Sequence, residues 1–224
     1  IIATVFLLVR RARRRLWRPC VMGALTLLAI AATGLTHSRN QVWESRASLW
    51  RDVVRKSPGK IIGHLELANV YADEKMFDRA IERLRIALSI EPSPDVHTNL
   101  GAIYQDDPKQ IDRAIYHYLR ALRLNPRYAM AHYNLGTAYA QQGRQEKALE
   151  HWHAACRIKP YPEAHNNLGT LYYFRREYEK ALEQYRIALE LRPDYAQVHR
   201  NLGLLYRETG RPEEACRHLR RYEA

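Results

Sequence analysis

Five histidines recur at a nearly constant spacing through residues 61–224. Each stands three residues before a leucine in one of five similar nine-residue stretches; they are His64, His97, His132, His165 and His199. Regularly spaced imidazoles suggest metal binding, but zinc requires its ligands about 2 Å from one centre. Units of a helical stack lie about 10 Å apart, so successive histidines are too distant to share an ion. We therefore predict that they pack between paired helices, hydrogen-bonded to neighbouring groups, and that the chain holds no metal and no cofactor.

An asparagine directly precedes the same leucine in four of the five stretches. These residues are Asn99, Asn134, Asn167 and Asn201, and Glu66 replaces asparagine in the first stretch. A side-chain amide presents a donor and an acceptor side by side, so it can pair with a peptide backbone of any sequence. Alternatively, each amide bonds a helix of the adjacent unit. The sequence leaves both interpretations open.

The leucines mark an internal repeat. They are 33 to 35 residues apart, at Leu67, Leu100, Leu135, Leu168 and Leu202. A small residue follows each leucine directly, and a tyrosine follows it four residues later. A second segment of each unit carries an alanine, with another alanine seven residues on in the first four units, and a proline closes those four. A period near 34 residues is that of helix–turn–helix solenoids.

Helix geometry explains each of these signals. A leucine and a tyrosine four residues apart lie on one face of a helix. The small residue beside them lets a second helix approach closely, and the two alanines form the matching face of that second helix. Proline lacks an N–H and cannot continue a helix, so it separates successive pairs. Because one pair cannot bury its apolar face alone, the pairs are expected to stack.

The pattern resembles the tetratricopeptide repeat. The resemblance covers residues 61–224. It implies an all-α fold, a right-handed superhelix (α-solenoid) of about five helical hairpins, with expected units at 61–93, 94–128, 129–161, 162–195 and 196–224. The asparagine row is similar to the asparagine ladder of the nucleocytoplasmic O-linked N-acetylglucosamine transferase, which holds extended polypeptide along its inner groove.

Repeat phase identifies the residues expected on the concave face, which is the usual binding surface of a solenoid. Amides, aromatic rings and arginines predominate there, and the last two are typical anchors of protein interfaces. The candidate partner-binding residues are Asn99, Asn134, Asn167, Asn201, Tyr133, Thr137, Tyr173, Phe174, Arg200 and Arg207. They include no lysine, which argues against the chaperone-docking repeats that grip a C-terminal carboxylate with lysine, arginine and asparagine.

The first 36 residues differ in composition from the repeats. Residues 1–9 are apolar, residues 10–19 contain six arginines, and residues 20–36 carry no charge. About 17 to 20 apolar residues can span a bilayer, although a secretory signal peptide has a similar order of residues. We expect residues 1–36 to be the tail of one membrane helix, an arginine-rich loop and one transmembrane helix. The positive-inside rule then places the loop in the cytoplasm and the repeats on the periplasmic or extracytoplasmic side.

Residues 37–60 are expected to join these two parts. An apolar stripe that includes Leu49, Trp50 and Val53 predicts a helix that ends before Pro58, the second helix of a degenerate capping repeat. Residues 1–60 resemble the C-terminal part of membrane glycosyltransferase-like proteins, in particular O-mannosyltransferase-like proteins with trailing tetratricopeptide repeats. The catalytic acidic residues of such enzymes lie in early membrane loops, and nothing here matches them. This resemblance therefore implies a catalytic domain upstream of this chain.

The charge distribution and the motif content argue against two classes of function, nucleic-acid binding and catalysis. The formal net charge is +12, but residues 1–60 hold 12 Lys/Arg against 2 Asp/Glu, whereas residues 61–224 hold 24 against 22. The repeats are nearly balanced, which argues against nucleic-acid binding. Phosphate-loop, GxSxG and HExxH motifs are absent from the sequence, so we predict no catalytic residues. We expect a membrane-tethered scaffold that binds an extended polypeptide or a partner protein. The alternatives are the substrate-presenting arm of a polytopic membrane glycosyltransferase and repeats that only assemble a homo-oligomer.

Overall fold

The computed structural model describes residues 45–223, which contain eleven α-helices, one short 3₁₀-helix and no strand. The chain divides at Pro58 into two units, of which the second comprises residues 59–224. The all-α prediction is therefore confirmed for the described residues.

In the first unit, the described part is the helix α2 (Arg46–Lys56). Ser45 caps its N-terminus, because its hydroxyl accepts a hydrogen bond from the backbone N–H of Ser48 at 3.0 Å, and the Ser48 hydroxyl in turn accepts from the Ser45 N–H. The helix ends before Pro58, as the sequence predicts. The role of residues 37–60 as a capping half-repeat stays a prediction.

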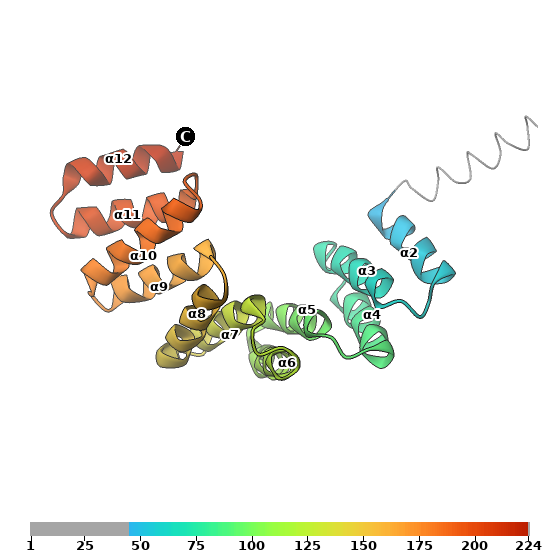
Figure 1. The fold of residues 1–224 in the computed structure, drawn as a ribbon. Coiled ribbons are helices and arrows are strands. Elements are labelled where there is room, and N and C mark those ends of the chain that lie inside the picture. The colour runs from blue at the N-terminus through green and yellow to red at the C-terminus, as the bar shows by residue number, and fades with distance from the viewer. Residues whose placement is uncertain (1–44, 224) are drawn as a thin grey trace, which may run out of the picture. The chain divides into compact units, whose positions relative to one another are not determined.

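The second unit is a series of five helical hairpins (Figure 1). Their helices are α3 (Ile61–Asp73) and α4 (Phe77–Ile90), α5 (Pro94–Gln105) and α6 (Ile111–Leu124), α7 (Ala129–Gln141) and α8 (Gln145–Ile158), α9 (Pro162–Phe174) and α10 (Tyr178–Leu191), and α11 (Ala196–Glu208) and α12 (Pro212–Glu223). The 3₁₀-helix η1 (Pro108–Gln110) lies in the turn of the second hairpin. We number these hairpins 1 to 5 and call their members the first and second helix.

Each hairpin is held together at the repeated small residue of its first helix. A Cβ placed on Gly101 would lie 2.4 Å from a ring carbon of Tyr118, so only glycine lets the tyrosine cross the helix at this point. Trp152 lies in the same way over Gly136 in hairpin 3. The five repeat leucines are at most 2% exposed, and both alanines of the second helix are fully buried in hairpins 1 to 4. The residues that recur in the sequence are therefore the ones that pack the two helices of each hairpin together.

Four hairpins turn in the same way. The residue that reverses the chain has a positive φ of 58° to 73° and is Lys75, Gly143, Arg176 or Gly210. Hairpin 2 contains one more residue than its neighbours in this turn and forms η1 instead. Glycine removes the steric cost of the left-handed conformation at two of these positions.

Successive hairpins meet mainly where the second helix of one packs against the first helix of the next. Within residues 59–223, α3 contacts α5, α5 contacts α7, and α9 contacts α11, whereas second helices of neighbouring hairpins contact each other less. The second helix of each hairpin packs instead against the first helix of the next. The layer of first helices is therefore the shorter, inner side of the stack.

The predicted membrane localisation is corrected by the helices of residues 45–223. The longest of them has 14 residues, whereas a bilayer span needs about 20, and no helix here combines the necessary length and apolar composition. This finding contradicts the predicted localisation, which was an integral membrane protein whose repeats lie on the periplasmic or extracytoplasmic side. The segments that suggested it, residues 1–36, lie outside the described residues.

Candidate functional site

The asparagine positions follow one another along the inner layer of first helices. We call the surface formed by Glu66, Asn99, Asn134, Asn167 and Asn201 the ladder face. Two of its amides bond the preceding hairpin. Asn99 donates to the Asn69 Oδ1 at 2.9 Å, and Asn201 donates to the Asn166 Oδ1 at 2.9 Å. These two amides therefore tie neighbouring first helices together, which is the second of the two interpretations that the sequence left open.

The other two amides are placed differently. Asn167 accepts a long bond of 3.4 Å from Asn166 and bonds the Tyr133 hydroxyl of the preceding hairpin. Asn134 is half-buried, and its amide has no hydrogen-bond partner within residues 45–223. Ala102 explains this difference. It holds the position in hairpin 2 that Asn69 holds in hairpin 1, and its side chain cannot accept a hydrogen bond as that of Asn69 does from Asn99. Asn134 thus keeps both its donor and its acceptor for a ligand.

Aromatic side chains flank Asn134. The ring of Tyr133 stacks on that of Tyr161 with centroids 4.8 Å apart and an interplanar angle of 24°. Burial raises the pKa of Tyr133, and the hydrogen bond from Asn167 opposes this shift. Tyr173 and Phe174 lie at the end of α9 in the next hairpin, where their rings contact each other and Phe174 is 74% exposed. The neighbourhood of Asn134 therefore offers apolar area together with an unsatisfied amide.

Thr137 has a structural role that sequence reasoning missed. Its hydroxyl accepts from the Trp152 indole N–H at 3.3 Å and donates to the Tyr133 carbonyl at 3.1 Å. In hairpin 4, the Thr170 hydroxyl likewise accepts a hydrogen bond from the Tyr185 hydroxyl at 3.2 Å. The threonine two residues after the repeat leucine, opposite an aromatic residue on the second helix, is the signal that reveals this pairing.

Arg200 and Arg207 are exposed on α11, and neither forms an ion pair with a described residue. They lie seven residues apart, about two helical turns, so both project from one side of the helix. Asn201 lies next to Arg200, about 100° around the helix from it. The two arginines therefore extend the ladder face at hairpin 5.

The repeated histidines do pack between paired helices, as predicted, and three of them face a second histidine. The Nδ1 atoms are 3.0 Å apart in His97–His117, 3.0 Å in His132–His151 and 2.9 Å in His199–His218. In hairpin 4, Gln184 takes the place of the second histidine, with its Oε1 2.8 Å from the His165 Nδ1. The sequence shows these partners 19 or 20 residues after each repeated histidine, a signal that we had not used.

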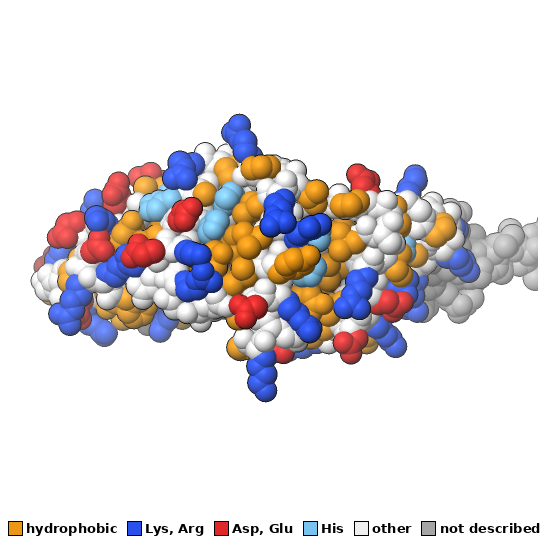
Figure 2. All heavy atoms as spheres, turned by 90° about the horizontal axis from the view of Figure 1, so that it is seen from below, with side chains coloured by type: hydrophobic (Ala, Val, Ile, Leu, Met, Phe, Trp, Pro, Cys, Tyr) orange, Lys and Arg blue, Asp and Glu red, His pale blue; other side chains and the backbone are white. Residues whose placement is uncertain are grey.

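Each histidine pair belongs to a column that also contains a tyrosine and a cation. In hairpin 3, the Arg144 guanidinium lies 4.6 Å from the Tyr139 ring, and that ring stacks on His151 at 5.6 Å. Hairpins 2 and 5 repeat the arrangement. Seen from below the view of Figure 1, histidines reach the surface among hydrophobic side chains, with both signs of charge interspersed (Figure 2). Groups of three or more metal-ligating residues do not occur in the described part of the chain.

A hollow of about 1250 Å³ lies elsewhere, between α4 and the hairpin formed by α5 and α6. Phe77 and Ile103 contribute to its apolar lining, and four basic and four acidic side chains also line it. The balance of charges favours no particular ionic ligand. None of the predicted partner-binding residues lies in this hollow.

Comparison with known proteins places these features in a family. The tetratricopeptide model described as "TPR repeat" matches residues 109–143, 136–174 and 175–210, and the model described as "Tetratricopeptide repeat" matches residues 198–223. Peroxisomal targeting signal receptors are 37% identical over 82 residues in Candida albicans and 35% identical over 82 residues in Candida glabrata. Each match covers 36% of this chain and 14% of the receptor, so the chain spans only a small part of these relatives.

Solved structures share the fold. PilF of Pseudomonas aeruginosa is 22% identical with a TM-score of 0.68, over 85% of this chain and 87% of PilF. YrrB, described as a TPR protein with an unusual peptide-binding site, is 20% identical with a TM-score of 0.58, over 79% of this chain and 91% of YrrB. The family models together span residues 109–223, which is 115 of the 224 residues. The chain therefore belongs to the tetratricopeptide repeat family.

Proposed function

We propose that this chain is a scaffold that binds an extended segment of another protein on its ladder face, through the backbone of that segment. The observation that carries the proposal is Asn134, a half-buried amide without a partner among the described residues, next to the stacked rings of Tyr133 and Tyr161. Because no described side chain uses this amide, its donor and its acceptor are both available to a ligand. A peptide backbone can supply both missing bonds at once.

Two further considerations support a peptide as the ligand. The inner layer of first helices is continuous from hairpin to hairpin, and such faces are the usual binding surfaces of solenoids. YrrB is described as having a peptide-binding site, and the curated relatives are receptors for a targeting signal. The ligand of this chain need not be the same, because the fold alone is shared with YrrB.

The test compares two asparagines that differ only in their partners. Peptides are selected from a library of random 12-residue sequences, and the affinity of the selected peptides is measured by fluorescence anisotropy. Asn134→Ala is expected to lower the affinity about fivefold, the value of one backbone hydrogen-bonding site. Its free energy of unfolding should change by less than about 0.5 kcal/mol, because no bond within the described structure is lost.

Asn99→Ala is the matched control. This substitution removes the 2.9 Å bond to Asn69 and should lower the free energy of unfolding by about 1 kcal/mol in urea titrations. A library that yields no binding peptide would remove the proposed function. Peptides that bind Asn134→Ala as tightly as the unaltered chain would show that binding occurs on another surface.

The other expected functions lack a comparable observation. The link to a glycosyltransferase depends on residues 1–60, of which the structure describes 45–60. Assembly of a homo-oligomer would require one copy to cover the ladder face of another, and nothing in the described residues favours this. Both stay predictions.

A further inference from the structure

We propose that the segment bound on the ladder face has separated charges, with basic residues at the end that lies on hairpins 1 and 2 and acidic residues at the end that lies on hairpin 5. This inference rests on the proposed function and adds the chemistry of the partner. It follows from the distribution of unpaired charges along the inner layer of first helices.

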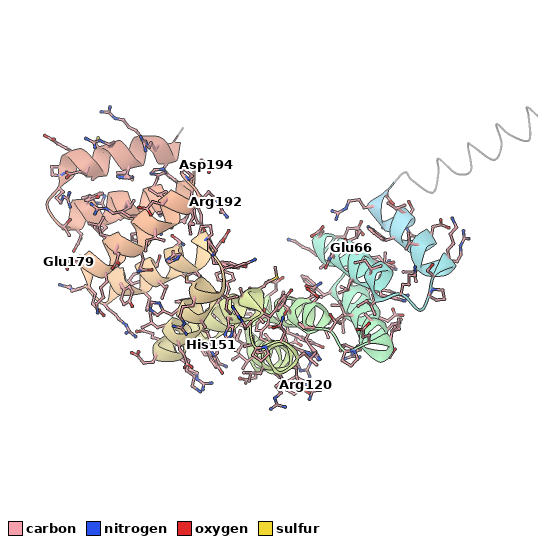
Figure 3. The ribbon with its side chains drawn as sticks, in the orientation of Figure 1. Glu66, Arg120, His151, Glu179, Arg192 and Asp194 are labelled. Atoms are coloured by element: carbon pink, nitrogen blue, oxygen red, sulfur yellow. The ribbon has the colours of Figure 1, made fainter. Side chains whose placement is uncertain are left out.

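The acidic end of the face begins with Glu66. It occupies the position that asparagine holds in the other four hairpins, so a carboxylate replaces an amide at this point of the ladder. Glu66 is half-buried on α3 and forms no ion pair within residues 45–223 (Figure 3). Asp106, at the end of the next first helix, is exposed and forms no ion pair in this range, and it also lines the hollow between α4 and the hairpin of α5 and α6. Asp95 accepts from the Tyr128 hydroxyl, a neutral partner that leaves its charge in place.

The basic end of the face is on α11. Arg200 and Arg207 share one side of this helix, about 100° around from Asn201, and neither forms an ion pair with a described residue. Glu208 is exposed and lies seven residues after Asn201, on the side of α11 that carries Asn201, so this end has two arginines against one carboxylate. A guanidinium pairs bidentately with a carboxylate, which makes arginine a suitable anchor for acidic side chains.

The middle of the face carries little net charge. Hairpin 3 contributes Tyr133, Asn134 and Thr137, and all three are uncharged. In hairpin 4, Glu163 forms an ion pair with Arg192, which is labelled in Figure 3 where the chain leaves α10. The face therefore runs from acidic, through uncharged, to basic, and an extended ligand would complement it with charges in the reverse order.

The distance between the two ends sets the length of the ligand. Four hairpin steps separate Glu66 from Asn201, and at about 10 Å per step they cover about 40 Å. An extended chain advances about 3.3 Å per residue, so a segment of about 12 residues bridges the two ends. The Debye length at physiological salt is about 8 Å, so each end senses only the charges that lie on it.

The test uses three synthetic 12-residue peptides, acetylated and amidated so that the termini add no charge. All have the same uncharged middle of six residues. One has three lysines at one end and three glutamates at the other, one has three glutamates at each end, and one has three lysines at each end. Affinities for the full chain are measured by fluorescence anisotropy at about 50 mM and about 500 mM salt.

Two charge variants complete the design. Glu66→Lys makes both ends of the face basic, and Arg200→Glu with Arg207→Glu makes both ends acidic. Each protein is expected to prefer the peptide whose ends oppose its own, by about tenfold at low salt, and the preference should vanish at high salt. This matching does not depend on the direction in which the peptide lies. Thermal unfolding should be nearly unchanged, since the altered side chains have no ion pairs to lose.

The outcomes separate the inference from the function beneath it. The expected result is that the three proteins each select a different peptide. If all three proteins rank the three peptides in one order, the face does not recognise separated charges and the inference is overturned while peptide binding stands. If neither these peptides nor library peptides bind, the proposed function fails and the inference fails with it.

Discussion

Replacing Gly169 by alanine is expected to lower the free energy of unfolding by about 3 kcal/mol, near the upper end of the range for an overpacked core. A Cβ at this position would lie 2.7 Å from the Cδ1 and Cε1 atoms of Tyr185, far inside van der Waals contact. The ring cannot withdraw without cost, because Tyr185 is 1% exposed and its hydroxyl donates to Thr170. Urea titration followed by circular dichroism measures the change.

The chain itself supplies the compensating substitution. Hairpin 1 has Ala68 and Leu84 at the positions of Gly169 and Tyr185, and both are fully buried. Tyr185→Leu should therefore reduce the cost of Gly169→Ala to less than about 1.5 kcal/mol, giving a large coupling energy in a double-mutant cycle. Additive effects of the two substitutions would contradict the idea that glycine is present to make room for the ring.

Lowering the pH from 7 to 5 is expected to destabilise the repeats, and His117 alone should lower the free energy of unfolding by roughly 1 kcal/mol after allowance for solvent screening. Burial lowers the pKa of His117 to about 4, and repulsion from His97 adds to this shift. Burial likewise lowers the pKa values of His97, His151 and His218. The expected change can be followed by urea titration at several pH values.

The direction follows from proton binding. An unfolded histidine has its usual pKa near 6.5, whereas the pKa values of His97, His117, His151 and His218 are lower in the folded chain. Between these values the unfolded chain binds more protons, so stability rises with pH through this window and falls as the solution becomes acidic. Geometry agrees, because the His132 Nε2 lies 3.1 Å from the Pro126 carbonyl and must donate to it. The His132 Nδ1 then accepts from His151, and full protonation would leave two donors facing each other.

Hairpin 4 provides the control for this prediction. It pairs His165 with Gln184, which does not titrate. Converting His117, His151 and His218 to glutamine copies that pair into hairpins 2, 3 and 5, and the dependence of stability on pH between 7 and 5 should become at least twofold weaker. A triple variant with the pH dependence of the unaltered chain would assign the effect to other groups. The arginines and lysines near the pairs include Arg85, Arg120, Lys147, Arg217 and Arg221, and they stay charged throughout this range.

The sequence by itself determined the repeat architecture. The period of the leucines, the small residue after each of them and the alanine pairs specify which helix faces meet, because helical spacing converts directly into a face. The predicted hairpins therefore agree with the observed helices within residues 61–223. The expectation that the repeated histidines pack rather than bind metal also followed from distance alone.

Only the tertiary structure decided which side chains are already in use. The four asparagines all precede the same Leu-Gly pair, yet Asn99 and Asn201 bond the preceding hairpin while Asn134 does not. The difference arises from Ala102, which lies more than 30 residues away in sequence, so no local pattern could reveal it. The pairing of Thr137 with Trp152 and the second histidine of each pair do have regular spacings in the sequence, but only the structure shows that these side chains meet. A hydrogen bond depends on the relative placement of two helices, and that placement is fixed by packing between hairpins rather than by the residues of either one.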